Sequence, residues 1–182
     1  MKSLFIDTTN NKIVFIYLHD NKLIDSIVVD AKNKISEIFD DELKMFLAKQ
    51  KTELNEISEF YVTKGPGTFT GVRIGLSIVK TIWTINKDIK VYSINTMQLM
   101  AGKSKVSVAI DARGGKHFFA SNTNGIIANN LEIVLNEKLP KENIITNLDN
   151  IDYVKNFSEV RDKFILETDI NNFNPIYIKN AI

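Results

Sequence analysis

Residues Lys64–Gly75 read Lys-Gly-Pro-Gly-Thr-Phe-Thr-Gly-Val-Arg-Ile-Gly, and this stretch decides the fold. It follows Glu59–Thr63, whose aromatic and β-branched residues are typical of a strand. Gly65 and Gly67 flank a proline, which predicts a tight backbone turn where that strand ends. The apolar residues after the turn recur at helical spacing, so the sequence predicts a strand, a glycine-rich turn and a helix in succession.

The turn is also a candidate anion site. Thr68 or Thr70 can cap the helix, which we expect to last to about Asn86, and bare amides at a helix N-terminus attract anions. The known phosphate loops do not fit, however. Walker A requires Gly-Lys-Ser/Thr, and a dinucleotide fingerprint requires a third glycine where Thr70 stands.

The segments before and after this stretch complete a lobe. Three β-rich runs separated by polar pairs predict an antiparallel meander over Leu4–Ile6, Ile13–Leu18 and Leu23–Val29. Apolar residues at steps of three and four predict an amphipathic helix over Ile35–Leu47, and Lys90–Ile94 predicts a further strand. The resulting order is typical of an RNase H-like or actin-like lobe.

A short repeat predicts a second lobe. Residues 6–12 and residues 110–116 share one pattern, Ile-Asp followed by four residues and Lys. We therefore predict a first lobe over residues 1–103 and a second, reduced lobe over residues 104–182. Within the second lobe we expect a third strand, a helix, a loop and a last strand, over Ile126–Leu135, Ser158–Leu166, Glu142–Asp152 and Asn174–Ile178 respectively.

The composition limits the classes of function. The 182 residues carry 23 Lys+Arg against 22 Asp+Glu, so no large basic field is available to grip a phosphate backbone. The absence of cysteine excludes disulfides, thiolate zinc sites and cysteine nucleophiles. The first apolar run stops at Asp7, too early for a signal peptide, and no stretch of about 18 apolar residues occurs. We expect a cytoplasmic protein without a membrane segment.

The glycine-rich stretch resembles a family signature. Gly65–Gly75 is similar to the Gly-Pro-Gly-Ser-Phe-Thr-Gly-Leu-Arg-Ile-Gly of the TsaB (YeaZ) family, whose members serve threonylcarbamoyladenosine (t6A) synthesis in transfer RNA. Ile6–Thr9 resembles the family's opening Leu-Asp-Thr-Ser, Ile110–Arg113 its Asp-Ala-Arg turn, and Pro175–Ile178 its closing Pro-Tyr-Leu region. The chain is shorter than is usual in the family, and the loss falls after Lys116.

The resemblance implies an α/β, actin-like/RNase H-like (ASKHA) fold of two lobes. It implies a non-catalytic scaffold or activator that binds a TsaD-type catalytic paralogue and a TsaE-type ATPase, needs no cofactor and touches transfer RNA at most indirectly. The alternative is a small ATP-dependent sugar or acyl kinase of the same superfold, with nucleotide and magnesium between its lobes.

Few side chains are candidates for chemistry. The catalytic paralogue holds a metal with a His-x-x-x-His pair, whereas His19 and His117 are far apart in this sequence, so we predict neither a metal site nor catalytic residues. Asp7 either holds magnesium and phosphate, as in actin-like kinases, or accepts turn amides, which we favour. The residues assigned to the family motif and the candidate anion site are Asp7, Thr8, Gly65, Gly67, Thr68, Thr70, Arg73, Asp111 and Arg113; Asp111 and Arg113 can also form an ion pair that fixes a turn.

The second helix carries two apolar stripes about 130 to 140° apart. The first consists of Val72, Leu76, Val79 and Trp83. The second, here called the isoleucine stripe, consists of Ile74, Ile78, Ile82 and Ile85. A helix on its own sheet needs one stripe, so the other is covered by the helix Ile35–Leu47 or by another chain. The family pairs through the two helices of lobe one, which favours another chain, either the catalytic paralogue or a second copy. The predicted interface is Ile74, Ile78, Ile82 and Ile85 with Gly71 and Gly75, small residues that permit close helix approach.

Overall fold

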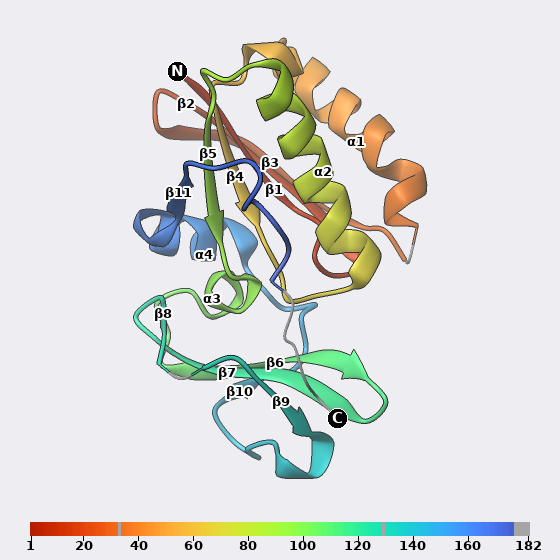
Figure 1. The fold of residues 1–182 in the computed structure, drawn as a ribbon, viewed down its shortest axis with the longest axis vertical. Helices are drawn as coiled ribbons and strands as arrows, with labels where there is room; N and C mark the ends of the chain where they lie inside the picture. Colours follow the sequence, from red (N-terminus) through yellow and green to blue (C-terminus); the bar gives the residue numbers. More distant parts are fainter. Residues whose placement is uncertain (33, 129, 177–182) are drawn as a thin grey trace.

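The computed structural model describes residues 1–32, 34–128 and 130–176, which form two sheets (Figure 1). The larger sheet has six strands in the order β11-β5-β4-β1-β2-β3. Strands β1, β2 and β3 form the predicted antiparallel meander, whereas β1, β4 and β5 run parallel. Their bounds are β1 Lys2–Asp7, β2 Lys12–His19, β3 Lys22–Asp30, β4 Glu59–Thr63, β5 Lys90–Ile94 and β11 Ile165–Glu167.

Helices cover both faces of this sheet. Alternate residues of β1 and β2 point to opposite faces, so Ile6 and Phe15 enter one core while Phe5 and Ile16 enter another. The first core is closed by α1 (Ile35–Lys49) and α2 (Phe69–Ile85), which lie side by side on one face (Figure 1). The second core is closed by α4 (Tyr153–Val160).

The smaller sheet joins the larger one through α3 (Thr96–Ala101). Its strand order is β10-β6-β7-β8, with β9 also paired to β7. Met97 and Met100 of α3 pack with Val108 and Ile110 of β6, so α3 lies between the sheets. The bounds are β6 Val106–Arg113, β7 Lys116–Thr123, β8 Ile126–Ile127, β9 Glu132–Leu135 and β10 Ile144–Ile145, with 3-10 turns η1 Leu54–Glu56, η2 Asn136–Lys138 and η3 Arg161–Lys163.

The structure confirms the elements predicted for the first 94 residues. The later elements differ. The sequence did not predict α3, and two short strands, β8 and β9, replace the single strand expected over 126–135. The predicted helix Ser158–Leu166 is displaced toward the N-terminus, because Ile165 and Leu166 pair with β5 as part of β11. Residues 174–176 are not in a strand, and Tyr177 and Ile178 lie outside the described residues.

Part of the segment assigned to the second lobe lies on the first sheet. β11 extends that sheet beside β5, and Phe173 enters the first core with its ring 6.0 Å from that of Trp83. The boundary at residue 103 remains a prediction. The described strands of residues 104–145 form the smaller sheet, and the chain then returns to the larger one.

Glycines hold α2 against the turn between β1 and β2. A Cβ atom on Gly67 would lie 2.1 Å from the carbonyl oxygen of Thr9, and one on Gly71 would lie 2.0 Å from that of Thr8. The Thr8 hydroxyl donates to the Gly71 carbonyl at 2.7 Å and accepts from the Gly75 amide at 3.1 Å. An α-helix normally joins these two backbone groups, so Thr8 is built into the end of the helix.

This packing corrects one part of the predicted interface. Gly71 and Gly75 are buried against Thr8 of the same chain, so they do not form a surface that another helix can approach. The small residues serve an internal contact because only glycine leaves room for the backbone of the β1–β2 turn.

Replacing Gly71 with alanine tests this contact, because the contact and helix propensity predict opposite changes in stability. Helix propensity alone predicts a gain of up to about 1 kcal/mol from Gly71→Ala. The overlap with the Thr8 carbonyl predicts instead a loss of about 1–3 kcal/mol, which thermal unfolding would show as a lower Tm. The exposed Ser77→Ala on the same helix is the control and should leave the Tm nearly unchanged. A higher Tm for Gly71→Ala would contradict the packing.

Candidate functional site

The glycine-rich turn lies where β4 ends. Gly65 has φ +96°, in the left-handed region that favours glycine, and is joined to Pro66 by a cis peptide bond. Thr68, rather than Thr70, caps α2: its hydroxyl accepts from the Gly71 amide at 3.2 Å. The Thr68 amide in turn donates to the Thr9 carbonyl at 2.7 Å, which fixes the helix N-terminus against the first hairpin.

A cleft of about 790 Å³ separates the two sheets beside this turn. The first lobe contributes Lys12, Asp30, Thr68 and Arg73, among others, and the second contributes Asp111, Arg113 and Phe118. The lining therefore contains both positive and negative side chains. Of the residues assigned to the candidate anion site, Gly67, Thr68, Thr70, Arg73, Asp111 and Arg113 line the cleft. Asp7, Thr8 and Gly65 do not.

Asp7 is buried at the end of β1, with 2% of its surface exposed. Its Oδ1 atom accepts from the Thr9 amide at 2.9 Å, the Thr9 hydroxyl at 2.7 Å and the Thr63 hydroxyl at 2.7 Å. Burial raises the pKa of this carboxyl above its ordinary value, while the hydrogen bonds from Thr9 and Thr63 oppose the rise. The carboxylate accepts a turn amide, as the favoured interpretation predicted.

The second acidic turn is held differently from the ion pair that we considered. The Arg113 amide donates to Asp111 Oδ1 at 2.8 Å, and Arg113 has a positive φ of 67°. The backbone amide, rather than the guanidinium group, therefore fixes the turn between β6 and β7. Across the cleft, Lys12 donates to the carbonyls of Leu148 and Asp149 at 3.4 and 3.1 Å, which connects the two lobes.

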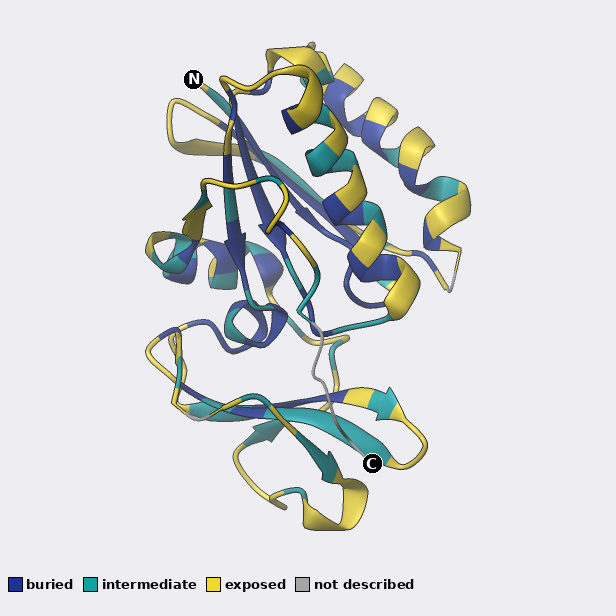
Figure 2. Cartoon of the chain, in the orientation of Figure 1, coloured by how far each residue is buried: buried dark blue, intermediate teal, exposed yellow. Residues whose placement is uncertain are grey.

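The isoleucine stripe is covered in part by its own chain. Ile74, Ile78 and Ile82 are partly buried and pack on the first core, whereas Ile85 is 81% exposed. A groove of about 440 Å³ remains between α1 and α2, lined by Phe39, Ile74 and Ile78 among others. Both covering candidates thus retain support, because α1 shields one side of the stripe and Ile85 at its end is exposed. Figure 2 shows buried and exposed residues side by side along α1 and α2.

Sequence reasoning missed an exposed aromatic residue beside this stripe. Phe69 is 64% exposed at the first turn of α2, and the guanidinium carbon of Arg73 lies 3.5 Å from its ring centre. The two residues line both the cleft and the α1/α2 groove. Their spacing of four residues on one helix was the available signal, since side chains at i and i+4 lie on the same face.

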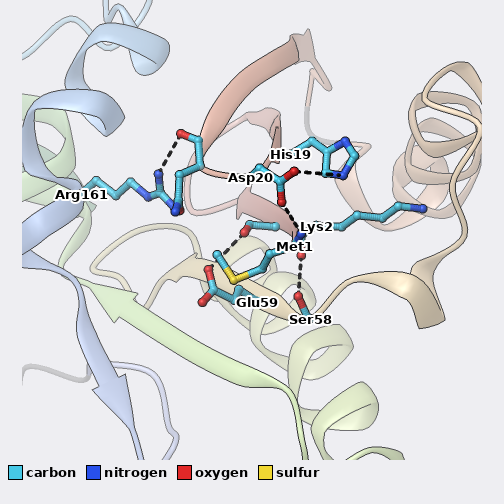
Figure 3. Close-up of polar contacts among 9 residues, drawn as sticks. Met1, Lys2, His19, Asp20, Ser58, Glu59 and Arg161 are labelled. Carbon is cyan, nitrogen blue, oxygen red and sulfur yellow. Dashed lines mark hydrogen bonds and ion pairs between the residues drawn. The ribbon is translucent and has the colours of Figure 1, made fainter.

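The two histidines lie in different sheets. His19 is at the end of β2, with Nε2 3.8 Å from Asp20, and His117 on β7 has Nδ1 2.8 Å from Asn136 (Figure 3 shows His19). Within residues 1–32, 34–128 and 130–176, no group of three or more histidine or acidic residues is arranged to hold a metal ion. No helix of that part of the chain has the length and apolar character required to cross a bilayer.

Comparison with known proteins agrees with the fold and with the motif. A family model described as TsaD, tRNA N6-adenosine threonylcarbamoyltransferase, matches residues 29–167. The chain is 27% identical to a Mycoplasma pneumoniae protein named "Uncharacterized protein MG208 homolog", over 98% of this chain and 95% of that protein. It is 31% identical to a Buchnera aphidicola protein named "tRNA threonylcarbamoyladenosine biosynthesis protein TsaB", over 70% of this chain and 62% of that protein.

Among solved structures, YeaZ from Pseudomonas aeruginosa matches with a TM-score of 0.74 and 15% identity, over 97% of this chain and 99% of that one. A second Pseudomonas aeruginosa structure, described as similar to peptidase YEAZ, has a TM-score of 0.78, also at 15% identity, over 98% and 99%. At this identity the likeness concerns the fold, and it confirms the predicted two-lobe α/β architecture.

Asp7 generates a prediction with a definite pH dependence. Asp7→Asn keeps an oxygen acceptor for Thr9 and Thr63, so at neutral pH its free energy of unfolding should be within about 1 kcal/mol of the parent's. Asp7→Ala should lose about 2 kcal/mol or more.

Because the folded-state pKa of Asp7 is raised, the stabilisation from protonated Asp7 is complete below the unfolded pKa of about 3.9 and is lost as pH rises through the folded pKa. The stability of the parent relative to Asp7→Asn should therefore increase as the pH is lowered from 7 toward 4, measured by urea unfolding. A difference that is constant with pH would contradict this.

Proposed function

We propose a function from one premise: this chain belongs to the TsaB (YeaZ) family of tRNA threonylcarbamoyladenosine biosynthesis proteins. Its function is that of a non-catalytic subunit in t6A synthesis. It binds a TsaD-type catalytic paralogue and works with a TsaE-type ATPase, and it contacts transfer RNA at most indirectly. The observation that carries the proposal is the burial and hydrogen bonding of Asp7. In an actin-like kinase this acid would hold the metal bound to the nucleotide.

Asp7 is unsuited to metal chemistry in this chain. Three donors already occupy one of its oxygens, and the side chain lies below the surface of the cleft rather than on its wall. A magnesium ion requires an accessible carboxylate and several water ligands. The histidines lie in different sheets, so the described chain brings no imidazole pair together either. These features support an accessory role.

The surface proposed for the catalytic paralogue is the open side of α2. Phe69 and Ile85 are exposed at opposite ends of this helix, and the α1/α2 groove lies between α2 and its neighbour. Exposed aromatic and arginine side chains beside an apolar groove are the residue types that contribute most to binding energy at protein interfaces. The same surface is the one proposed for pairing between copies through the lobe-one helices.

The kinase alternative rests on the cleft. Its volume of about 790 Å³ is within the range of small-molecule sites, and it lies at the carboxyl ends of parallel strands. A kinase nevertheless has to place an acid on the cleft wall to hold magnesium. Asp30, Asp111 and Asp149 are on that wall, but all three are exposed and each already has a partner. Asp30 and Asp111 accept the amides of Lys32 and Arg113, and Asp149 pairs with Lys12.

Activity assays on the isolated chain separate the two functions. We expect neither threonylcarbamoyl transfer nor phosphoryl transfer, and no tight binding of ATP–magnesium by calorimetry. The TsaD-type paralogue from the same organism should co-purify with this chain. Turnover by the isolated chain that is lost on Asp7→Ala would support the kinase instead.

The exposed end of the isoleucine stripe provides the binding test. Ile85→Asp should weaken the complex with the catalytic paralogue by about 10- to 100-fold, because burial of an isoleucine contributes about 1.5–3 kcal/mol. The Tm should change little, since Ile85 is 81% exposed. Thr84→Asp, one residue away on the polar side of α2, carries the same new charge and should bind like the parent. Equal binding by both variants would place the interface elsewhere.

A further inference from the structure

Two segments of the described chain cross between the lobes. The chain leaves the first lobe through residues 102–105, between α3 and β6, and returns through residues 146–152, between β10 and α4. Figure 1 shows the two sheets with α3 between them. The angle between the lobes therefore depends on what holds these crossing segments and on how α3 packs.

The apolar contact at α3 does not fix this angle by itself. Met97 and Met100 pack with Val108 and Ile110 of β6. Apolar contacts of this kind are non-directional, and packed helices slide over one another in shear motions. Hydrogen bonds are directional, so the polar contacts at the two crossings have to define the angle.

The first crossing is held from both lobes. Asn122 of β7 is buried, and its Nδ2 atom donates to the carbonyls of Gly102 and Ser104 at 3.1 and 2.8 Å. From the other lobe, Glu159 of α4 accepts the amide of Lys103 at 3.0 Å. This segment therefore cannot move away from either lobe without breaking a hydrogen bond.

The second crossing is held by one side chain, that of Lys12 at the start of β2. Its Nζ atom donates to the carbonyls of Leu148 and Asp149 at 3.4 and 3.1 Å and lies 3.4 Å from the Asp149 carboxylate. Only 16% of the Lys12 side chain is exposed. Leu148 packs on the core formed by α3 and β6, so Lys12 connects the larger sheet to the core of the second lobe.

The two crossings differ in their position relative to the cleft. Lys12, Leu148 and Asp149 line it, whereas residues 102–105, Asn122 and Glu159 do not. Rotation of the second lobe about the first crossing would therefore change the width of the cleft and move Leu148 and Asp149 relative to Lys12. We propose that Lys12 is a clamp that holds the two lobes at one angle and the cleft at one width.

The clamp limits what the cleft can do. Enzymes that enclose a ligand between two lobes do so by hinge rotation. Lys12 opposes such a rotation, because hydrogen bonds from a charged donor are about twice as strong as neutral ones. The inference goes beyond the proposed function, since the clamp acts whether or not a partner is bound to α2.

Distance measurements between the lobes test the clamp. The chain contains no cysteine, so nitroxide labels can be attached at Ser77→Cys on α2 and Glu137→Cys on η2, both of which are exposed. Electron–electron resonance should give one narrow distance distribution for the labelled parent. Lys12→Met keeps the apolar stem and removes the donor, so the distribution should become broader. Exchange of the Asp149 amide hydrogen should also become about tenfold faster or more, because the segment loses a charged hydrogen bond.

Lys44→Met on α1 is the matched control. Lys44 is exposed, so this variant loses the same charge and should behave like the parent in both measurements. A Lys12→Met distribution as narrow as the parent's would overturn the proposal, and so would an unchanged rate of Asp149 exchange.

Trp83 fluorescence and the Tm report whether each variant is folded. If Lys12→Met does not fold, Lys12→Gln takes its place, because it shortens the side chain and removes the charge but keeps a polar group. It should broaden the distribution in the same way. Unfolding of both variants would overturn the proposal, since Lys12 would then support the first lobe itself rather than the angle between the lobes.

Discussion

The first lobe depends on one close backbone approach, between the β1–β2 turn and the start of α2. Three glycines on the α2 side, Gly67, Gly71 and Gly75, leave no side chain between the two segments. Thr8 uses this space to join its hydroxyl to two backbone groups of the helix, and Thr68 bonds to both its own helix and Thr9. The angle at which α2 crosses the sheet follows from this contact, and so do the positions of the α1/α2 groove and of the cleft wall.

The same contact explains why the cleft and the apolar surface share residues. Phe69 and Arg73 belong to the first turns of α2, directly after its N-cap. Both residues line the cleft and the α1/α2 groove, so they lie between the two. A molecule bound in the cleft and a molecule bound in the groove would contact the same two side chains. Asp7, in contrast, supports the turn from below, where its carboxylate bonds to Thr9 and Thr63. The acid is thus a structural part of the approach, not a group exposed to a ligand.

Local patterns predicted the first lobe well because its elements are long and periodic. The apolar run of β2 is continuous from Ile13 to Leu18, and the helical spacing in α1 extends over several turns. Signals of this length indicate both the type of an element and its bounds. The second lobe has strands as short as two residues, as in β8 and β10, and these are determined by pairing with β7 and β6 rather than by their own composition. The helix predicted over Ser158–Leu166 shows the same effect. Ile165 and Leu166 form a strand there because they pair with β5.

The sequence correctly indicated that the glycines allow a close approach. The neighbour, however, is the β1–β2 turn of the same chain rather than another helix. Sequence spacing shows that Gly71 and Gly75 are one turn apart, yet it cannot show which backbone fills the space beside them. The side chains around Asp7 pose the same difficulty, since Thr63 comes from a strand 56 residues away. Tertiary contacts of this kind need the sheet register, which a single sequence gives only indirectly.

The route of the chain after β10 has a consequence for its length. Glu167 of β11 pairs with Lys64 at 2.6 Å, beside the glycine-rich turn, and the Ile176 amide donates to the Lys64 carbonyl at 2.8 Å. The smaller sheet is therefore topologically an insertion, entered from α3 and left toward α4, with both of its ends tied to the first lobe. An insertion anchored at both ends can gain or lose residues at little cost in loop-closure entropy, and the core of the first lobe keeps its packing. Trimming of the protein is accordingly cheapest in the smaller sheet, where a shortened hairpin leaves β11, Phe173 and the glycine-rich turn in place.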